Sequence, residues 1–559
     1  MPQIKPGRFG PGGEPTRMRW LLLACTGALA LPVLGVLAAW FGLNADSLAL
    51  LQHQVSTVLP AYTLQSLLLV LGVAVGVAAV GGATAAAVTL FEFPGRRALE
   101  WALLLPLALP AYVLAYAYTD ALQYSGPLQV GLRALTGAQG ALWPDVRSLP
   151  GAIALFIVCL YPYVYLLART ALGEQAGPLM EAARLLGAPL RRRVLEVALP
   201  MARPALAAGV ALALMETLAD YGVGAYFGLS TFTTGIYKAW LVMDDRLAAA
   251  QLASVLLLVV GALLWAEQRA QARLRFAGGR GAAPGGLSAR PMALRGGAAV
   301  VAWLVCGVPV LLGFVLPVAW LGWLLWREAE ASESAVFVPA YLARFGEWAS
   351  TSFQLAGLAA GLAVGLALAL AFALRRGPRP GAAWLRAGAR LVSLGYAVPG
   401  AVVAVGILVW TGLIQAAAPA LGAPALVTGT VFGLVYAYLV RFGAVALQSV
   451  QAGYARLPAS FDESARLLGA DRRRLFLEVH LPLLGRSAVA AALLVFVDTM
   501  KELPATLVLR PFGSDTLAVV AYQFARDERL AEAALPSLAI VAVGLIPVLM
   551  LSRAMRGAS

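Results

Sequence analysis

The stretch Glu181–Pro200, EAARLLGAPLRRRVLEVALP, returns at Glu463–Pro482 as ESARLLGADRRRLFLEVHLP. The two copies lie 282 residues apart, and 14 of their 20 aligned positions are identical without a gap. A repeat at about half the chain length indicates two homologous halves. Both copies are polar segments of an otherwise apolar chain, and each precedes another hydrophobic stretch. We therefore expect the repeated segment to face water and to contact a partner that both halves share.

Each copy predicts a short helix, a glycine turn and a second helix. Ser460 and Glu463 have the spacing of a capping box, and Pro178 is suited to the first turn of the other copy. Gly187 and Gly469 are natural helix stops. A basic amphipathic loop lying on a membrane would explain either copy alone, but it would not explain their pairing, order and spacing.

The composition excludes an ordinary soluble enzyme. Of the 559 residues, 61% are hydrophobic and only 13% are charged, which is typical of a polytopic helical membrane protein. The net charge of +14 does not indicate nucleic-acid binding, because the basic residues lie in short loops between apolar stretches. Cys25, Cys159 and Cys306 fall inside apolar runs without metal or disulfide spacing, so we expect them to be small buried hydrophobes.

Twelve stretches are apolar enough to be membrane-spanning helices, six in each half of the chain. The first follows Arg17 and Arg19 without a convincing cleavage site and is interpreted as an uncleaved helix. The expected division is a first domain at 1–266, a basic glycine-rich linker at 267–296 and a second domain at 297–559. The predicted spans are 20–41, 62–90, 99–122, 151–171, 201–220, 248–266, 297–326, 351–374, 388–415, 425–447, 485–500 and 533–552.

The basic residues predict the orientation in the membrane. With a cytoplasmic N-terminus, 29 of the 42 lysines and arginines fall in cytoplasmic segments and 10 in external ones. Both termini and both repeated loops would then be cytoplasmic. Because the linker is also inside, the two halves have the same topology and form a parallel repeat.

The sequence has no P-loop for ATP hydrolysis. Its only lysines are Lys5, Lys238 and Lys501, and none follows a glycine-rich phosphate-binding pattern. The chain is therefore predicted not to be an enzyme. Its activity must depend on a separate ATPase or on another energy source.

The repeated loops resemble the EAA loops of ABC-importer permeases, with Ser464 replacing the middle alanine of the second copy. The resemblance implies the all-α type I importer permease fold, with about 12 transmembrane helices. It also implies two copies of a cytoplasmic ABC ATPase, which use the ATP, and no directly bound cofactor. The residues implied to couple to the ATPase are Glu181, Ala182, Ala183, Gly187, Glu463, Ser464, Ala465 and Gly469.

A second repeated feature follows each loop. Glu216 matches Asp498, and Asp220 matches Glu502, at the same offset of 282 residues. Acids at positions i and i+4 share one helical face. At 1.5 Å per residue from Pro200, they would lie about 24 and 30 Å along the helix, near the outer mouth.

These four acids are candidates for the translocation path. Such groups are costly in a membrane and usually face a cavity or an opposite charge. Internal pairing with Lys501 or Arg441 would explain them. The functional alternative is a ring of oxygen ligands for a hard, highly charged cation.

The runs 219–240 and 500–518 resemble the fused permeases of bacterial iron(III) importers. The resemblance implies a bacterial inner-membrane protein that receives iron(III) from a periplasmic binding protein. Fused permeases for thiamine, aminoethylphosphonate or other oxyanions share this architecture and remain the alternative. Two alternative functions of other classes are an ion-coupled secondary transporter and a receptor or sensor. The sequence shows no evident soluble sensor domain that would support the receptor or sensor.

Three further observations carry weaker hypotheses. Tyr112, Tyr116, Tyr118 and Asp120 suit iron(III), yet an interfacial aromatic belt is the favoured interpretation. Pro110 and Pro399 occupy matching places and are expected to bend their spans, for gating or for packing. His53 and His480 are not grouped, and His480 is expected to be a contact or solvent residue.

Overall fold

A computed structural model describes residues 16–38, 40, 45–173, 177–278, 291–331, 336–375 and 382–556. Eleven of the helices in this part of the chain are long and apolar enough to cross a membrane. A bent pair, Arg96–Ala108 with Ala111–Thr136, brings the number to 12 if it counts as one span. These helices confirm an all-α, multi-pass membrane protein with about 12 spans.

The described helices of the first half begin with α1 and end with α13, and the one strand among the residues described there is β1. Their bounds are α1 Thr16–Ala38, α2 Ala45–Ser56, α3 Leu59–Leu90, β1 Phe91–Glu92, α4 Arg96–Ala102, η1 Leu105–Ala108, α5 Ala111–Leu122, α6 Pro127–Thr136, α7 Leu149–Ala171, α8 Gly177–Leu185, α9 Leu190–Arg193, η3 Val194–Ala198, α10 Leu199–Ala219, α11 Gly222–Tyr226, α12 Phe232–Tyr237, η4 Lys238–Val242 and α13 Arg246–Gly278.

The second half repeats this order from β2 to α26. Its bounds are β2 Met292–Ala293, α14 Gly297–Val310, η5 Leu311–Val315, α15 Leu316–Glu330, α16 Pro339–Leu374, α17 Ala382–Leu394, η6 Gly395–Ala397, α18 Gly400–Ala417, η7 Pro419–Leu421, α19 Ala423–Thr428, α20 Val431–Ala455, α21 Ser460–Leu467, α22 Arg472–Arg474, η8 Leu475–His480, α23 Leu481–Met500, α24 Pro504–Leu509, α25 Leu517–Arg526 and α26 Leu530–Arg556.

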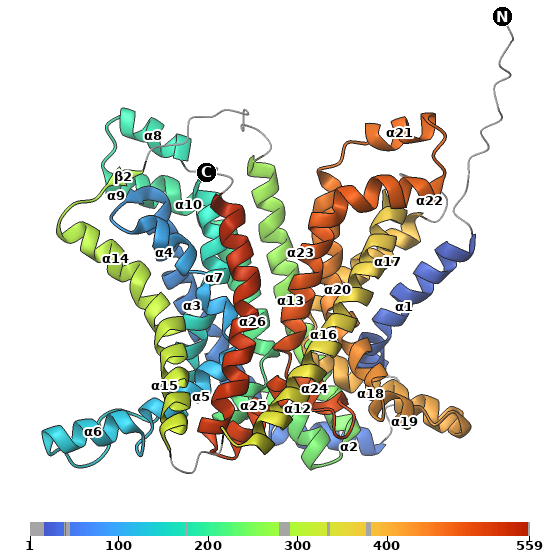
Figure 1. Ribbon diagram of the computed structural model, residues 1–559, viewed down its shortest axis with the longest axis horizontal. Coiled ribbons are helices and arrows are strands. Elements are labelled where there is room, and N and C mark those ends of the chain that lie inside the picture. Colours follow the sequence, from blue (N-terminus) through green and yellow to red (C-terminus); the bar gives the residue numbers. More distant parts are fainter. Residues whose placement is uncertain are drawn as a thin grey trace, which may run out of the picture.

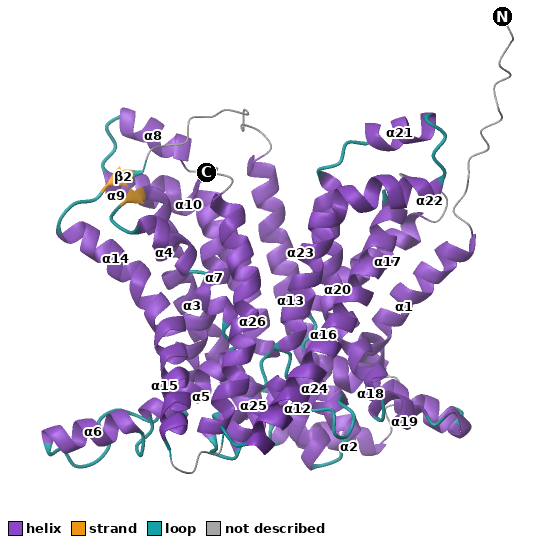
Figure 2. Ribbon diagram, viewed as in Figure 1, coloured by secondary structure: helices purple, strands orange, loops and turns teal. Residues whose placement is uncertain are grey.

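The two repeated loops lie at one end of the molecule. Figure 1 shows α8 and α21 above the long helices, while α6 and α19 extend sideways at the opposite end. Both halves therefore run in the same direction, as a parallel repeat requires. In Figure 2 the strands stand out beside α9 as the non-helical pair.

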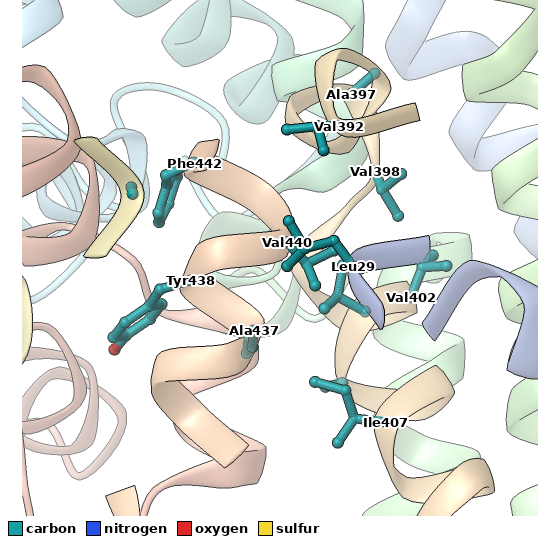
Figure 3. Close-up of a cluster of buried hydrophobic side chains, with 14 of the residues drawn as sticks. Leu29, Val392, Ala397, Val398, Val402, Ile407, Ala437, Tyr438, Val440 and Phe442 are labelled. Carbon is teal, nitrogen blue, oxygen red and sulfur yellow. The ribbon is translucent and has the colours of Figure 1, made fainter. Parts of the chain in front are cut away.

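The first helix packs against the second half. Helix α1 contacts α17 and α18, and the indole N–H of Trp410 donates to the Leu31 carbonyl at 2.6 Å. A Cβ on Gly406 would collide with the Pro32 carbonyl, so a glycine is needed for this close approach. Figure 3 shows Leu29 of α1 among the buried side chains of α18 and α20.

The first helix of the second half makes the reciprocal contact. Gly313 of η5 lies against the Val158 carbonyl of α7. Nearby, the Tyr118 hydroxyl donates to the Leu312 carbonyl at 2.6 Å. The first helix of each predicted half, 1–266 and 297–559, thus packs against the other half. The internal repeat of the sequence is not affected by this exchange.

The third span of each half is broken at its proline. Pro110 is the N-cap of α5, and Pro399 is the N-cap of α18, both in extended backbone conformation. Proline cannot donate a hydrogen bond to the preceding turn, so a new helix starts there. In the first half the two pieces meet at 92°. The expected bend is therefore a full break.

The connection between the halves is partly regular. Helix α13 continues to Gly278, beyond the predicted end of its span at 266, so the first part of the linker is helical. Residues 279–290 lie outside the described residues. After them, Met292–Ala293 pairs in parallel with Phe91–Glu92, which ties the start of the second half to the first.

Candidate functional site

The repeated loops have the predicted helix–glycine–helix geometry. Gly187 and Gly469 adopt left-handed backbone conformations, with φ of +79° and +83°. Each follows a short helix, and the next residue donates its N–H back to the helix, from Ala188 to the Ala183 carbonyl and from Ala470 to the Ala465 carbonyl, both at 3.0 Å. This is the usual glycine-terminated helix end.

The predicted capping box is wrong. Helix α21 begins at Ser460, one residue earlier than the box requires, and its N-cap is Ala459 without a side-chain hydrogen bond. Pro458 precedes this N-cap, and the N–H of Asp462 donates to the Ala459 carbonyl at 3.0 Å. The turn after a proline therefore starts this helix without a serine cap.

Both short helices present leucines to the outside. Leu185 and Leu186 are 84% and 87% exposed, and Leu467 and Leu468 are 89% and 88% exposed. Adjacent exposed apolar side chains at equivalent places mark an interaction surface. The loop residues that the sequence singles out lie around them: Glu181, Ala182, Glu463 and Ser464 are exposed, and Ala183 and Ala465 are half-buried.

His480 is not a solvent residue, which corrects the sequence-based expectation. Only 1% of it is exposed, and its Nε2 lies 3.0 Å from Oδ1 of Asp462. Its Nδ1 lies 3.2 Å from the Tyr454 hydroxyl. An apolar run with one histidine gives no signal for this pairing, because Asp462 lies 18 residues earlier in the sequence.

The four candidate acids line a single cavity between the two halves. Glu216 and Asp220 come from the end of α10, and Asp498 and Glu502 come from the end of α23. The cavity volume is about 130 Å³, which is enough for a small cargo with a few waters. The structure therefore brings together all four residues that the repeat offset pairs.

This cavity lies inside the molecule and not at its outer mouth. Its wall includes Phe156 and Tyr163 from the middle of α7, and Arg441 from the middle of α20. Helix α10 stops at Ala219, where the chain turns into α11. The count of helical rise places the acids too far outward, because it assumes that the helix crosses the whole molecule, whereas α10 ends beside the middle of α7 and α20.

Glu502 is fully engaged in internal contacts. Its Oε1 accepts from Nη1 of Arg441 at 2.9 Å, and the side chains are 0% and 9% exposed. Its carboxylate also accepts from the backbone N–H of Ala505 and of Thr506, both at 2.9 Å, and from the Thr506 hydroxyl at 2.6 Å. Glu502 therefore neutralises a buried arginine and caps α24.

The other acids make fewer contacts. Asp498 pairs with Lys501 at 3.0 Å. Asp220 accepts from the Val223 N–H at 2.8 Å and so caps α11 as Glu502 caps α24. Glu216 interacts with the Tyr396 hydroxyl. The internal pairing considered from the sequence thus accounts for Asp498 and Glu502.

The structure does not form a ring of carboxylate ligands. Among the described residues, no group of three or more His, Cys, Asp or Glu side chains is arranged to hold a metal ion. The acids instead combine with Arg441 and Lys501 in a cavity of mixed charge, with four carboxylates against two basic groups. This balance still favours a positively charged cargo over an anion.

The aromatic-belt interpretation is wrong for two of the three tyrosines. Tyr112 and Tyr116 are 3% and 1% exposed within the protein, and Tyr112 lines the cavity. Its hydroxyl lies 3.3 Å from the Lys501 carbonyl and joins the two halves. Asp120 does not reach the cavity but accepts from the Trp320 indole N–H at 2.9 Å.

Tyr163 and Tyr396 are cavity residues that the sequence analysis missed. Tyr163 is the middle one of three alternating tyrosines and Tyr396 stands alone in an apolar span, so neither has a signal that distinguishes it, and each comes from a different half. Only the packing of α7 and of the η6 turn beside the ends of α10 and α23 brings them together.

Comparison with known proteins identifies the class. Residues 78–275 match the family described as binding-protein-dependent transport system inner membrane component. The chain is 25% identical over 506 residues to the Fe(3+)-transport system permease protein FbpB 2 of Haemophilus influenzae. The aligned region covers 87% of this chain and 88% of the relative.

Shorter similarities extend to other permeases. The putative 2-aminoethylphosphonate transport system permease protein PhnU of Salmonella choleraesuis is 26% identical over 31% of this chain and 62% of its own length. The sulfate transport system permease protein CysT of Escherichia coli is 28% identical over 33% of this chain and 66% of its own length. With its helical architecture, the chain is an all-α multi-pass permease, and its residues 78–275 match the model of binding-protein-dependent transport-system inner-membrane components.

Proposed function

We propose that this permease is the membrane subunit of an ATP-driven importer for iron(III). It receives the cation from a periplasmic binding protein and releases it into the cytoplasm by alternating access. The main support is the similarity to an iron(III) permease, which extends over 87% of the chain and includes both halves. The excess of carboxylates in the cavity agrees with a cationic cargo.

The motor is a pair of cytoplasmic ABC ATPase subunits, one for each half. Support comes from the two exposed helices α8 and α21, which lie at the same end of the molecule and end in equivalent exposed leucines. This assignment places both loops and both termini in the cytoplasm of a bacterial inner membrane. ATP is used by the partner, and the permease itself binds no cofactor and performs no chemical step.

Transport then follows from rigid-body motion. When the ATPase pair closes on ATP, it draws α8 and α21 together, and the two halves rock about the contact that encloses the cavity. Tyr112 and Lys501, which join the halves beside the acids, lie where such rocking would open the cavity. Glu216 and Asp220 are the acids with most freedom to meet the cargo, because Asp498 and Glu502 have basic partners.

The test is uptake of radioactive iron(III) into proteoliposomes that contain the permease, its ATPase and its binding protein. We expect the variant Glu216→Gln with Asp220→Asn to lose at least tenfold in uptake while retaining the ATPase. We expect Glu181→Ala with Glu463→Ala to release the ATPase instead.

The outcomes separate the cargo from the motor. Unaltered iron uptake in the first variant would refute the role of those acids in the path. ATP-independent uptake by the wild-type permease would refute the importer mechanism and favour ion-coupled transport. Uptake of 2-aminoethylphosphonate or sulfate in place of iron(III) would show that the cargo is an oxyanion. Oxyanions are the second candidate class of cargo because the chain is also similar to permeases for these two solutes.

A further inference from the structure

The second exposed helix, α21, is attached to the long helices through a buried polar network. The two carboxylate oxygens of Asp462 in α21 share the single Nε–H of Arg375, at 3.0 and 3.2 Å, and Oδ1 lies 3.0 Å from Nε2 of His480. Arg375 is the C-cap of α16, and His480 is the last residue of η8, directly before α23. One carboxylate therefore connects α21 to two long helices.

Arg375 extends this network to the end of α20. Its Nη1 donates to the Tyr454 carbonyl at 3.2 Å. Its Nη2 donates to the Leu457 and Pro458 carbonyls, both at 3.0 Å, in the segment that leads from α20 to α21. The Tyr454 and Pro458 carbonyls also accept backbone N–H groups of this segment, so the guanidinium adds further contacts to an already hydrogen-bonded turn and fixes the approach of α21.

The first half has an apolar set at the same positions. Displaced by the repeat offset of 282 residues, the network residues Tyr454, Asp462 and His480 become Leu172, Met180 and Ala198, and the helix-end position of Arg375 corresponds to Phe91, the C-cap of α3. Leu172, Met180 and Ala198 are buried in one hydrophobic cluster, and Phe91 packs against it. The two halves therefore attach their exposed helices by different physical means, although the loop sequences themselves are closely similar.

The two attachments have different mechanical properties. Apolar packing is non-directional, so one surface can slide on another while buried area is retained. Hydrogen bonds weaken steeply when their angles change, and the Arg375 guanidinium donates at once to the Asp462 carboxylate and to the carbonyls at the end of α20, which fixes their relative orientation. A displacement of α21 is thus transmitted to α16 and α23, whereas a displacement of α8 can be partly absorbed.

We propose that Arg375, Asp462 and His480 are positioning residues that couple α21 to the long helices of the second half, and that this half responds more directly to the ATPase. The inference rests on the proposed function, since it assumes that α21 is the ATPase contact. It adds that the two halves are unequal in coupling and names the residues responsible.

The test compares the variant Asp462→Asn with wild type in the assembled complex. The substitution keeps the shape of the side chain and removes its charge. We expect an unchanged dissociation constant for the ATPase, a maximal transport rate lowered at least tenfold, and more ATP hydrolysed per cargo moved. The matched control is Glu478→Gln, which removes an exposed carboxylate paired with Arg474 in the neighbouring turn and should change none of these.

A second variant keeps the inference testable if Asp462→Asn folds poorly. Arg375→Phe, Tyr454→Leu, Asp462→Met and His480→Ala together copy the apolar set of the first half. We expect this variant to assemble with the ATPase and to transport faster than Asp462→Asn, but still below wild type.

Two results would overturn the inference. Asp462→Asn with wild-type transport and ATP consumption would show that the network does not couple. Asp462→Asn that loses ATPase binding, with α21 newly open to proteolysis, would show that the network only holds the fold. Failure of the wild-type permease to bind the ATPase would instead refute the proposed function.

Discussion

The buried pair between Arg441 and Glu502 allows a quantitative prediction. We expect Arg441→Met to destabilise the protein by about 3 kcal/mol, because it leaves a carboxylate in the interior without its cation. Breaking such a pair usually costs about 3–5 kcal/mol. The lower end applies here, since Glu502 keeps hydrogen bonds to Ala505 and Thr506 after the change.

The assay is equilibrium unfolding in mixed micelles with increasing SDS, monitored by tryptophan fluorescence. The double variant Arg441→Met with Glu502→Gln should recover about 1–3 kcal/mol of the loss, since it removes the uncompensated charge. The control Arg474→Met breaks an exposed pair with Glu478 and should cost less than about 1 kcal/mol. A loss for Arg441→Met as small as that of the control would refute the reasoning.

Three further predictions concern other parts of the molecule. Leu467→Ser with Leu468→Ser should weaken ATPase binding in a pull-down without lowering the midpoint of unfolding, since both side chains are exposed; normal binding would argue against this surface. Gly406→Leu should destabilise by at least about 1–3 kcal/mol, because its side chain would collide with Pro32 of α1, and an unchanged unfolding midpoint would contradict this contact. Burial acts to raise the pKa of Asp462, but the hydrogen bonds from Arg375 and His480 outweigh burial and hold this pKa below its ordinary value of 3.8. The network's contribution to stability is therefore complete above about pH 3.8 and is lost as the pH falls through the lowered pKa. The protection of the α21 amides relative to their intrinsic exchange rates should therefore be independent of this carboxyl between about pH 5 and 8 and fall only in stronger acid, and a loss of protection already at pH 5 would contradict that sign.

The sequence predicted the helical membrane class, the approximate spans and the paired loops, because hydrophobic length and internal repeats are properties of the chain itself. It also grouped Glu216, Asp220, Asp498 and Glu502 correctly by the repeat offset, and one cavity contains all four. The offset works because equivalent helices approach each other around the axis of the repeat.

Other features depend on contacts between distant segments and could not be predicted in this way. Hydropathy marks α1 as a span but does not say that it packs against α17 and α18. The partners of His480 and the burial of Tyr112 follow from the same kind of long-range packing. Even a local signal failed at Ser460, where a preceding proline turn decides the helix start.

The exchanged first helices have a consequence for biosynthesis. Helix α1 ends at Ala38, yet the α18 segment against which it packs is complete only at Ala417. At a translation rate of about 5–20 residues per second, α1 waits roughly 20–80 s in the lipid before its final neighbours emerge from the ribosome. In a chain cut at the linker, α1 would have to find these neighbours on a separate polypeptide, so the fusion of the two halves supplies each newly made α1 with its neighbours on the same chain.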